Sequence, residues 1–445
     1  MFSRRDLLRA TGLGLWGISS SGWLPAFADE VARHPARRRQ CVLLWMPGGP
    51  SQIDTFDMKP RHANGGAYKE IATSVPGLGL SEHLPKLAGQ AEHLAIVRSL
   101  STKEGDHGRG TYLMRTGHQQ GGPIKYPAIG ASLAKELGSE EAEVPNYVSI
   151  APYSFFSPAS FSSGFLGPRY APLTVGVREE EAGGQSPAAQ SRGYAQLGVD
   201  DLSPHAGVTP KQATSRLDIW KSLEDGFVSR HRTASAIAHQ TVYQRAVRMM
   251  KSEAAQAFDL SNEDDKTRER YGRGRFGQSC LMARRLIERG VPFVEVSLGG
   301  LGNGGIGWDT HQDNFRLVQQ LSAELDAGWG TLLAELAERG LLDTTTILWM
   351  GEFGRTPRIN NTAGRDHFPA AWSCVFAGGG IHGGQAYGRT SADGMTVEDG
   401  KVDVGDVLAT LCAALGINPA AENISEEGRP IKIAEGKAIE AILRG

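Results

Sequence analysis

The sequence of 445 residues predicts an α/β fold with a mostly parallel central sheet and helices on both faces of that sheet. Two observations support this prediction. Short, continuous apolar runs recur along the chain and end in glycine-rich loops, which is typical of strands buried on both faces. Between these runs lie longer segments whose apolar residues recur at helical spacing. Strands that alternate with amphipathic helices favour a parallel sheet with both faces covered.

Four apolar runs are predicted as strands. The first ends in the turn Pro47-Gly48-Gly49-Pro50, and the third is rich in β-branched residues, which favour strands. The predicted strands lie at residues 41–46, 292–297, 344–350 and 372–377.

Three segments are predicted as helices. The clearest extends from Asn314 to a stop at Gly340, with apolar residues at helical spacing throughout. A helix over 277–288 precedes the second strand, and a helix over 404–415 closes the core.

Residues 152–207 are rich in Ser, Pro, Gly and Ala, and their apolar residues show no sustained period. We therefore expect a loop-rich insertion within a single domain over 41–445.

The start of the chain predicts export. Arg4-Arg5 is followed by Leu7-Leu8, a weakly apolar stretch and the small-residue site Ala26-Phe27-Ala28, in the order of a signal peptide over 1–28. Paired arginines in this position resemble the signal of the bacterial twin-arginine translocase. Residues 29–40 form a basic linker, and the expected location is the periplasm or the cell surface. The alternative is a membrane anchor, although the apolar segment is shorter than the ~20 residues of a span.

Composition and hydropathy argue against nucleic-acid binding and against a membrane span in the mature protein. The formal net charge is −2, which gives no basic footprint for nucleic acid. No later segment is apolar for long enough to cross a bilayer, so we expect no membrane span after signal removal. The cysteines, Cys41, Cys280, Cys374 and Cys412, lie in apolar runs without C-x-x-C spacing and are predicted to be buried free thiols.

Polar residues that follow the predicted strands are the candidate site, because ligands of open α/β sheets bind beyond the carboxyl ends of strands. Carboxylate and imidazole groups are common ligands of first-row metals. The predicted metal ligands are Asp309, His311, Glu352, Asp366 and His367. In the alternative, Asp309 caps a helix, Glu352 pairs with Arg355, and the histidines form hydrogen bonds in the core.

Four further residues are candidates for catalysis or anion binding. Asp54 and Thr55 follow the first strand, and Arg109 and Arg355 lie in polar loops where a guanidinium could hold an anion. Ser51 and Thr111 are further candidate nucleophiles, together with a metal-bound water. The glycine-rich segment around His382 lacks the spacing of a phosphate-binding loop and is predicted to be a backbone turn.

Six motifs together resemble the bacterial family named domain of unknown function 1501, within the alkaline-phosphatase-like, or sulfatase-like, superfamily. These motifs are GGPSQIDTFDMKP (48–60), GDHGRGTYLMRTG (105–117), CLMARRLIERGVPFVEV (280–296), GWDTHQDNF (307–315), GEFGRTPRIN (351–360) and GRDHFPAAW (364–372). The resemblance implies two divalent metals and a nucleophile that attacks a phosphate or sulfate ester.

The resemblance also assigns roles residue by residue. It implies that Asp309 and His311 form one metal-binding loop, that Glu352 stands for the strand-end aspartate, and that His367 is the late histidine. The chain departs from the superfamily pattern at Gly48-Gly49, where a metal-binding aspartate is expected, and at Phe353, where a histidine is expected. Asp54 or Asp57 could replace the missing aspartate.

Two functions follow from these observations. The first is an exported metal-dependent hydrolase of phosphate or sulfate esters, with zinc the favoured metal and manganese, iron or calcium as alternatives. Its substrate would be an anionic small molecule or a glycan. The second is a non-catalytic binding or assembly protein on the same fold, which recognises a glycan or a cell-surface partner, because fold alone does not fix function.

Overall fold

The computed structural model describes residues 39–139, 142, 144–177, 193–199, 202, 207–231, 233–251, 253–300 and 306–444. The expected signal peptide at 1–28 and most of the basic linker at 29–40 lie outside these residues. Among the helices within them, none combines the length and the apolar character that crossing a membrane requires.

The described part of the chain is built around a nine-stranded sheet. Strands β12 and β7 run antiparallel to their neighbours, and the other strands point in one direction. In spatial order the strands are β13 (Gln385–Tyr387), β4 (Leu94–Leu100), β12 (Trp372–Gly378), β9 (Thr345–Met350), β1 (Gln40–Trp45), β8 (Phe293–Ser297), β5 (Tyr147–Ile150), β6 (Leu173–Val177) and β7 (Leu197–Gly198). The predicted α/β fold with a mostly parallel sheet is confirmed.

The four predicted strands form the centre of this sheet, in the order β12, β9, β1, β8. The direction of β12 is not evident from its apolar pattern, which is the same for parallel and antiparallel neighbours. Because β12 is antiparallel, the residues that precede it lie at the carboxyl edge of β9 and β1. The glycine-rich turn that follows it, with His382, lies at the opposite edge.

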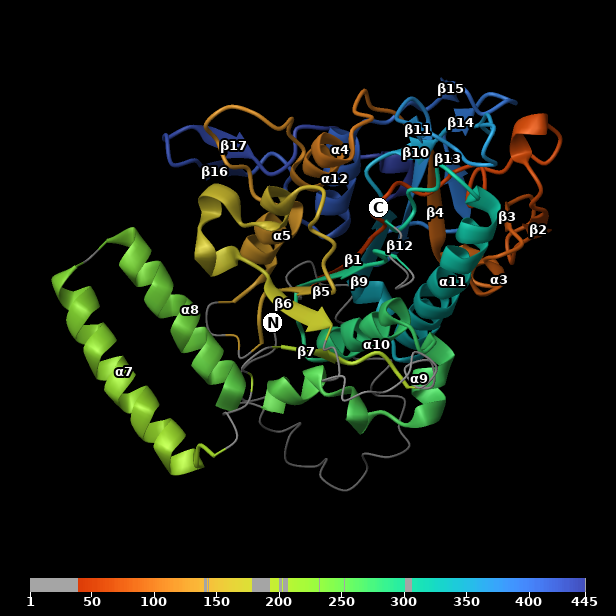
Figure 1. Cartoon of the computed structure of the whole chain (residues 1–445). Helices are drawn as coiled ribbons and strands as arrows, with labels where there is room; N and C mark the ends of the chain where they lie inside the picture. The colour runs from red at the N-terminus through yellow and green to blue at the C-terminus, as the bar shows by residue number, and fades with distance from the viewer. Residues whose placement is uncertain are drawn as a thin grey trace, which may run out of the picture.

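Helices cover both faces of the sheet (Figure 1). Val42 and Leu44 of β1 face a core shared with α10 (Arg275–Glu288) and α11 (Asn314–Glu338). Cys41 and Leu43 face the other core, which is covered by α4 (His107–Thr116), α5 (Ile129–Leu137) and α12 (Val404–Ala414). The three predicted helices are α10, α11 and α12, and the four cysteines are buried and free as predicted.

Smaller helices and strand pairs lie around the central sheet. They are α3 (Pro85–Ala88), α9 (Asp265–Tyr271) and the two-stranded pairs β2 (Glu70–Ala72) with β3 (Gly79–Ser81), β10 (Gly354–Arg355) with β11 (His367–Phe368), β14 (Arg389–Thr390) with β15 (Val397–Asp399), and β16 (Glu422–Ile424) with β17 (Pro430–Lys432).

The described residues of 152–207, and the segment after them, contain regular secondary structure. The expected insertion contributes β6 and β7 to the edge of the central sheet, and three short 3-10 helices precede β6. After it, α7 (Pro210–Arg230) and α8 (Ala234–Lys251) form a helical hairpin beside the sheet (Figure 1). The sequence pattern missed this hairpin because many of its apolar side chains are exposed, including Ile219, Leu223 and Phe227.

A buried ion pair fixes α4, the helix that carries part of the site, against the sheet. Arg115 of α4 donates to Glu295 of β8 at 2.6 Å, and the two side chains are 1% and 0% exposed. Tyr147 also donates to Glu295, at 2.8 Å, and the Arg115 guanidinium lies 3.6 Å from the centre of the Phe161 ring. Loss of one partner would leave an uncompensated charge in the core.

We therefore expect Glu295→Gln to lower the free energy of unfolding by about 3 to 5 kcal/mol, because Arg115 would remain buried without its counter-ion. Urea denaturation followed by circular dichroism measures this change. The matched control is Glu338→Gln, since Glu338 is 62% exposed and pairs loosely with Arg270 at 3.7 Å. The control should change stability by less than about 0.5 kcal/mol, and equal effects of the two variants would contradict the prediction.

Candidate functional site

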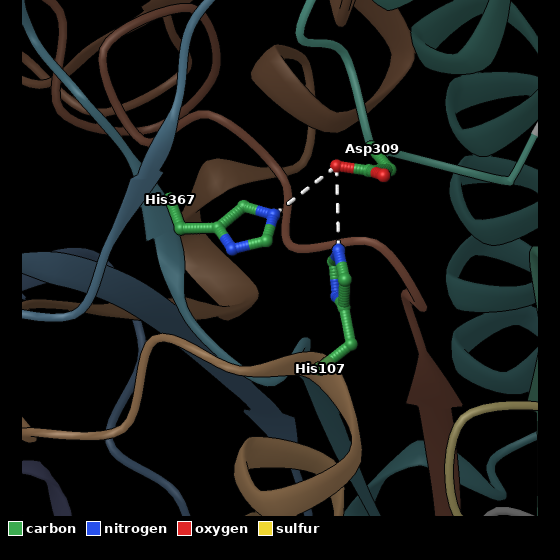
Figure 2. Close-up of side chains that lie close together, drawn as sticks. All are labelled: His107, Asp309 and His367. Carbon is green, nitrogen blue, oxygen red and sulfur yellow. Dashed lines mark hydrogen bonds and ion pairs between the residues drawn. The ribbon is translucent and has the colours of Figure 1, made fainter.

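Three side chains from separate segments of the chain converge at the carboxyl edge of the sheet (Figure 2). His107 is the first residue of α4 and follows β4, and Asp309 lies in the loop after β8. His367 lies in β11, just before the antiparallel strand β12. The strand directions therefore bring the three segments to one edge.

The donor atoms of His107, Asp309 and His367 all lie within 4.8 Å of one another. The Oδ1 atom of Asp309 is 3.3 Å from Nε2 of His107 and 3.4 Å from Nε2 of His367 (Figure 2). Two imidazoles and a carboxylate at these separations form a donor set that suits a divalent transition metal.

His311 adds a third imidazole beside this cluster. Its Nε2 atom is 3.1 Å from Oδ1 of Asp309 and 2.9 Å from Nε2 of His367. Its Nδ1 atom is 2.8 Å from Oδ1 of Asp366, which fixes the orientation of the ring. His311 is 41% exposed, so it lies on the solvent side of the cluster. The structure thus brings together Asp309, His311 and His367, with Asp366 behind His311.

Glu352 lies behind His107 rather than beside Asp309. Its Oε1 atom is 2.6 Å from Nδ1 of His107 and accepts a hydrogen bond from the Gly48 N–H at 2.7 Å. The side chain is 0% exposed, and its Oε2 atom has no hydrogen-bond partner among the described residues. The predicted metal ligand Glu352 is therefore placed to orient the His107 ring.

His107 was not among the predicted metal ligands. The signal for it was its place at the end of the loop that follows β4, a strand that the apolar pattern did not single out. Asp106 caps α4 by accepting a hydrogen bond from the Arg109 N–H at 3.0 Å, which fixes the helix start at His107.

The neighbouring charges perturb the proton affinities of the cluster. Burial lowers the pKa of His107, but hydrogen bonds and charges from Asp309 and Glu352 outweigh burial and raise that pKa to about 9. Burial raises the pKa of Asp309, but hydrogen bonds from His107 and His367 and the charge of Arg355 hold it well below its usual range. Asp309 is therefore a carboxylate at neutral pH. Strongly perturbed groups in a cleft are typical of functional sites.

Arg355 holds Asp309 from the protein interior. Its Nη2 atom is 2.6 Å from Oδ1 of Asp309, and the guanidinium is 0% exposed. It also donates to the backbone carbonyls of Gly48, Gly49 and Arg365. The Arg355 guanidinium therefore fixes the Asp309 carboxylate from the protein interior. The sequence pattern had instead predicted that Arg355 holds an anion.

The Gly48-Gly49 turn lies where the resemblance described above implies a metal-binding aspartate. Gly48 has φ +100°, and a Cβ atom there would lie 2.3 Å from the backbone nitrogen of Asp309. An aspartate at this position would collide with the loop that carries Asp309. The turn therefore has close backbone packing in place of a side-chain ligand, and the Gly48 N–H donates to Glu352 at 2.7 Å.

Asp54 and Thr55 lie in the protein interior next to the site. Asp54 is 0% exposed and pairs with Arg365 through two contacts, at 2.7 and 2.9 Å. Asn314 donates to the same carboxylate at 2.8 Å, and the Thr55 hydroxyl donates to the Ser51 carbonyl at 2.7 Å. These contacts tie the loop after β1 to the loop that carries His367. A catalytic role for Asp54 or Thr55 stays a prediction.

Arg109 lies at the mouth of the site. It is 59% exposed, and its Nε atom is 2.6 Å from the Glu104 carboxylate. It lines an open pocket of about 660 Å³ together with Gly105, Asp106, His107, Gly108, Phe156 and His367. Of the predicted catalytic residues, Arg109 is therefore the one that borders a space a substrate could occupy.

A family model described as protein of unknown function (DUF1501) matches residues 38–443. The chain belongs to the DUF1501 family. No curated protein matches this DUF1501 chain.

Several solved structures are similar to the DUF1501 protein. The Ps i-CgsB protein in complex with k-i-k-neocarrahexaose has 11% identity and a TM-score of 0.41, covering 90% of this chain and 75% of that chain. The PsFucS1 sulfatase from Pseudoalteromonas sp. has 11% identity and a TM-score of 0.41, covering 89% and 72%. The lipoteichoic acid synthase LtaP from Listeria monocytogenes has 9% identity and a TM-score of 0.40, covering 92% and 80%.

The position of Asp54 in this DUF1501 protein generates a prediction that separates structure from catalysis. We expect Asp54→Asn to lower the free energy of unfolding by about 3 to 5 kcal/mol, because Arg365 would keep a buried charge without its bidentate partner. Urea denaturation measures the change. Asp366→Asn is the control, since Asp366 is 53% exposed and should leave stability nearly unchanged. Unaltered stability in Asp54→Asn would contradict the structural role.

Proposed function

We propose that this DUF1501 protein is an exported hydrolase that uses a divalent metal to cleave phosphate or sulfate esters. The observation that carries the proposal is the convergence of His107, Asp309 and His367 at the carboxyl edge of the sheet, with their donor atoms within 4.8 Å of one another. The resemblance to the alkaline-phosphatase-like superfamily supports the type of reaction.

The residues present fit a metal. Zinc binds imidazole and carboxylate atoms at ~2.0 to 2.2 Å, so donors that share one ion lie within about 4 Å of each other. The distances of 3.3 and 3.4 Å from Asp309 to the two histidines satisfy this limit, and all three donor atoms lie within 4.8 Å of one another. Two imidazoles favour zinc, manganese or iron over calcium, which prefers an all-oxygen site.

The carboxylate of Glu352 supports the same conclusion. Metal-bound histidines usually donate their second ring nitrogen to a carboxylate, which fixes the tautomer and the ring orientation. Glu352 meets Nδ1 of His107 at 2.6 Å and leaves Nε2 directed toward Asp309. The buried Arg355 orients Asp309 in the same way that Glu352 orients His107, because its guanidinium contacts the Asp309 carboxylate from the protein interior.

A bound metal would supply Lewis-acid stabilisation of the ester and a water nucleophile of lowered pKa. The chain's own residues would do the rest. His311 is oriented by Asp366 and faces the cluster from the solvent side, so it is placed to give a proton to the departing alcohol oxygen. Arg109, at the pocket mouth, is placed to attract the anion before it reaches the metal.

The second candidate is a binding protein that keeps the fold without turnover. It is favoured by Phe353, which is fully buried where the superfamily has an imidazole, and by the positions of the hydroxyl candidates. The hydroxyls of Ser51 and Thr111 are buried and have no hydrogen-bond partner within the described chain. Neither residue lines the pocket, which leaves water as the nucleophile of the enzyme hypothesis.

Metal analysis of the purified protein tests the proposal. We expect at least one divalent metal per chain by mass spectrometry after dialysis. The metal should be lost in the single variant His107→Ala and in the double variant that carries both His311→Ala and His367→Ala. Glu352→Gln should weaken affinity by about 10- to 100-fold, because it alters the carboxylate that orients His107. His382→Ala is the control, since His382 lies at the opposite edge of the sheet and should keep full metal content.

The same samples separate the two functions. Metal-dependent release of alcohol from a phosphate or sulfate ester, lost in His107→Ala, would establish the hydrolase. Metal binding without turnover of either ester class would favour the binding protein. If the wild-type protein holds no metal under any loading condition, the proposed metal centre is wrong.

The export part of the proposal rests on Arg4 and Arg5. We expect Lys at both positions to block export, because the translocase reads the arginine pair as an address and not as charge alone. Cell fractionation with N-terminal sequencing measures this, and the mature protein should begin near Asp29. Recovery of an uncleaved product from the membrane would show that the segment is an anchor.

A further inference from the structure

Three aromatic side chains form a ledge beside the candidate metal centre. They are Tyr153, Phe155 and Phe156, which we call the aromatic ledge. We propose that the aromatic ledge binds the flat apolar face of a ring in the alcohol part of an anionic ester. The substrate class is then a phosphate or sulfate ester of a sugar or of a phenol. This inference rests on the proposed function, whose site it extends.

The aromatic ledge is a continuous cluster. Ring centres are 5.3 Å apart between Tyr153 and Phe156, 6.0 Å between Phe155 and Phe156, and 6.3 Å between Tyr153 and Phe155. The cluster follows β5, so it lies at the same carboxyl edge as the loops of the metal centre. Tilted contacts of this kind are favourable arrangements of aromatic rings.

Phe156 joins the aromatic ledge to the metal centre. Its ring stacks on that of His107, with ring centres 4.2 Å apart and an angle of 4° between the planes. Phe156 also lines the pocket that His107, His367 and Arg109 border. A ligand in this pocket therefore meets an apolar wall on one side and imidazole and guanidinium groups on another.

Phe155 is the exposed end of the aromatic ledge. It is 76% exposed, the highest value among the large exposed apolar residues of the described chain. Its ring contacts within the described residues are with Tyr153 and Phe156. An exposed apolar ring beside a polar pocket is a feature of binding sites, because a ligand that covers it removes apolar surface from water.

The backbone holds the aromatic ledge in place. Ala151, between β5 and the ledge, has φ +47°, a left-handed conformation that is uncommon outside glycine and often occurs at functional sites. Tyr153 packs directly on Gly299, where an added Cβ would lie 2.7 Å from the Tyr153 ring. Gly108 allows α4 to approach Phe156, whose carbonyl oxygen would lie 3.0 Å from a Cβ there.

This geometry selects a ring over a flexible chain. The aromatic ledge offers planar faces, on which a sugar or aryl ring can lie with little loss of its own conformational freedom, because such rings are already rigid. The ester group at the edge of such a ring would point toward Arg109 and the histidines. A short alkyl ester would reach the same charged groups without contacting Phe155.

Calorimetry on the full-length, metal-loaded protein tests the inference with four probes. These are phenylphosphonate, methylphosphonate, glucose 6-sulfate and inorganic phosphate. We expect Phe155→Ala to weaken the binding of phenylphosphonate or of glucose 6-sulfate by about 3- to 10-fold. The affinities for methylphosphonate and phosphate should stay unchanged. Phe155→Trp should restore ring binding, whereas Phe155→Leu should not. Phe227→Ala is the matched control, because Phe227 of α7 is also an exposed phenylalanine, at 51%, and should change nothing.

The probe whose affinity falls in Phe155→Ala identifies the substrate class, which is aryl for phenylphosphonate and sugar for glucose 6-sulfate. Equal loss for all four probes, or no loss for either ring, would overturn the ledge. Saturation-transfer NMR with phenol and methyl glucoside needs no metal and separates this inference from the proposed function. Ring signals that vanish in Phe155→Ala, in a protein that binds no anion, would support the ledge and refute the hydrolase. Absence of ring signals in the wild-type protein would refute the ledge.

Discussion

The carboxylate of Asp309 is the group on which the candidate site depends. It lies within 3.5 Å of three imidazole nitrogens and of the buried Arg355, so several positive or proton-donating groups share one acceptor. Together these groups hold the pKa of Asp309 well below its usual range despite burial. A permanent carboxylate at this point gives the histidines a common direction, since each ring turns a nitrogen toward it. The site is thus organised by one anion before any ligand arrives.

The support for Asp309 comes largely from buried groups. Arg355 connects it to the Gly48-Gly49 turn, and that turn in turn donates to Glu352, which orients His107. The chain of contacts therefore returns to Asp309 through His107. Because most members of this circuit are buried, removal of one leaves another without a partner, and the penalty for an unpaired buried charge is large. This closed arrangement explains why glycines, rather than a further acidic ligand, follow β1.

Much of the fold could be predicted from the sequence, and the reason is physical. Strands β1, β8, β9 and β12 are buried on both faces and read as continuous apolar runs, and α11 has a long apolar stripe. The hairpin of α7 and α8 could not be predicted in the same way, because its apolar residues lie on exposed as well as packed sides. The direction of β12 also could not be predicted from the sequence, because a buried strand has the same apolar pattern in either orientation.

The candidate site was predictable only where residue type and strand position coincided. Asp309, His311 and His367 follow or precede strands with clear apolar patterns, and the structure brings them together. Asp54 satisfied the same rule, yet its carboxylate is paired with Arg365, a partner 311 residues away along the chain. His107 follows β4, whose pattern is interrupted by Arg98, so the rule did not reach it.

The two sides of the pocket place different demands on the chain. The polar side needs fixed directions, and contacts with Asp309, Glu352, Arg355 and Asp366 supply them. The aromatic ledge needs an accessible apolar face, which the protein can provide only by leaving Phe155 in water and bracing the backbone beneath it at Ala151 and Gly299. Apolar exposure of this kind opposes the hydrophobic driving force of folding. Imidazole and carboxylate groups and an exposed ring therefore lie at the same edge, which is the combination that the proposed ligand, with one charged and one apolar end, requires.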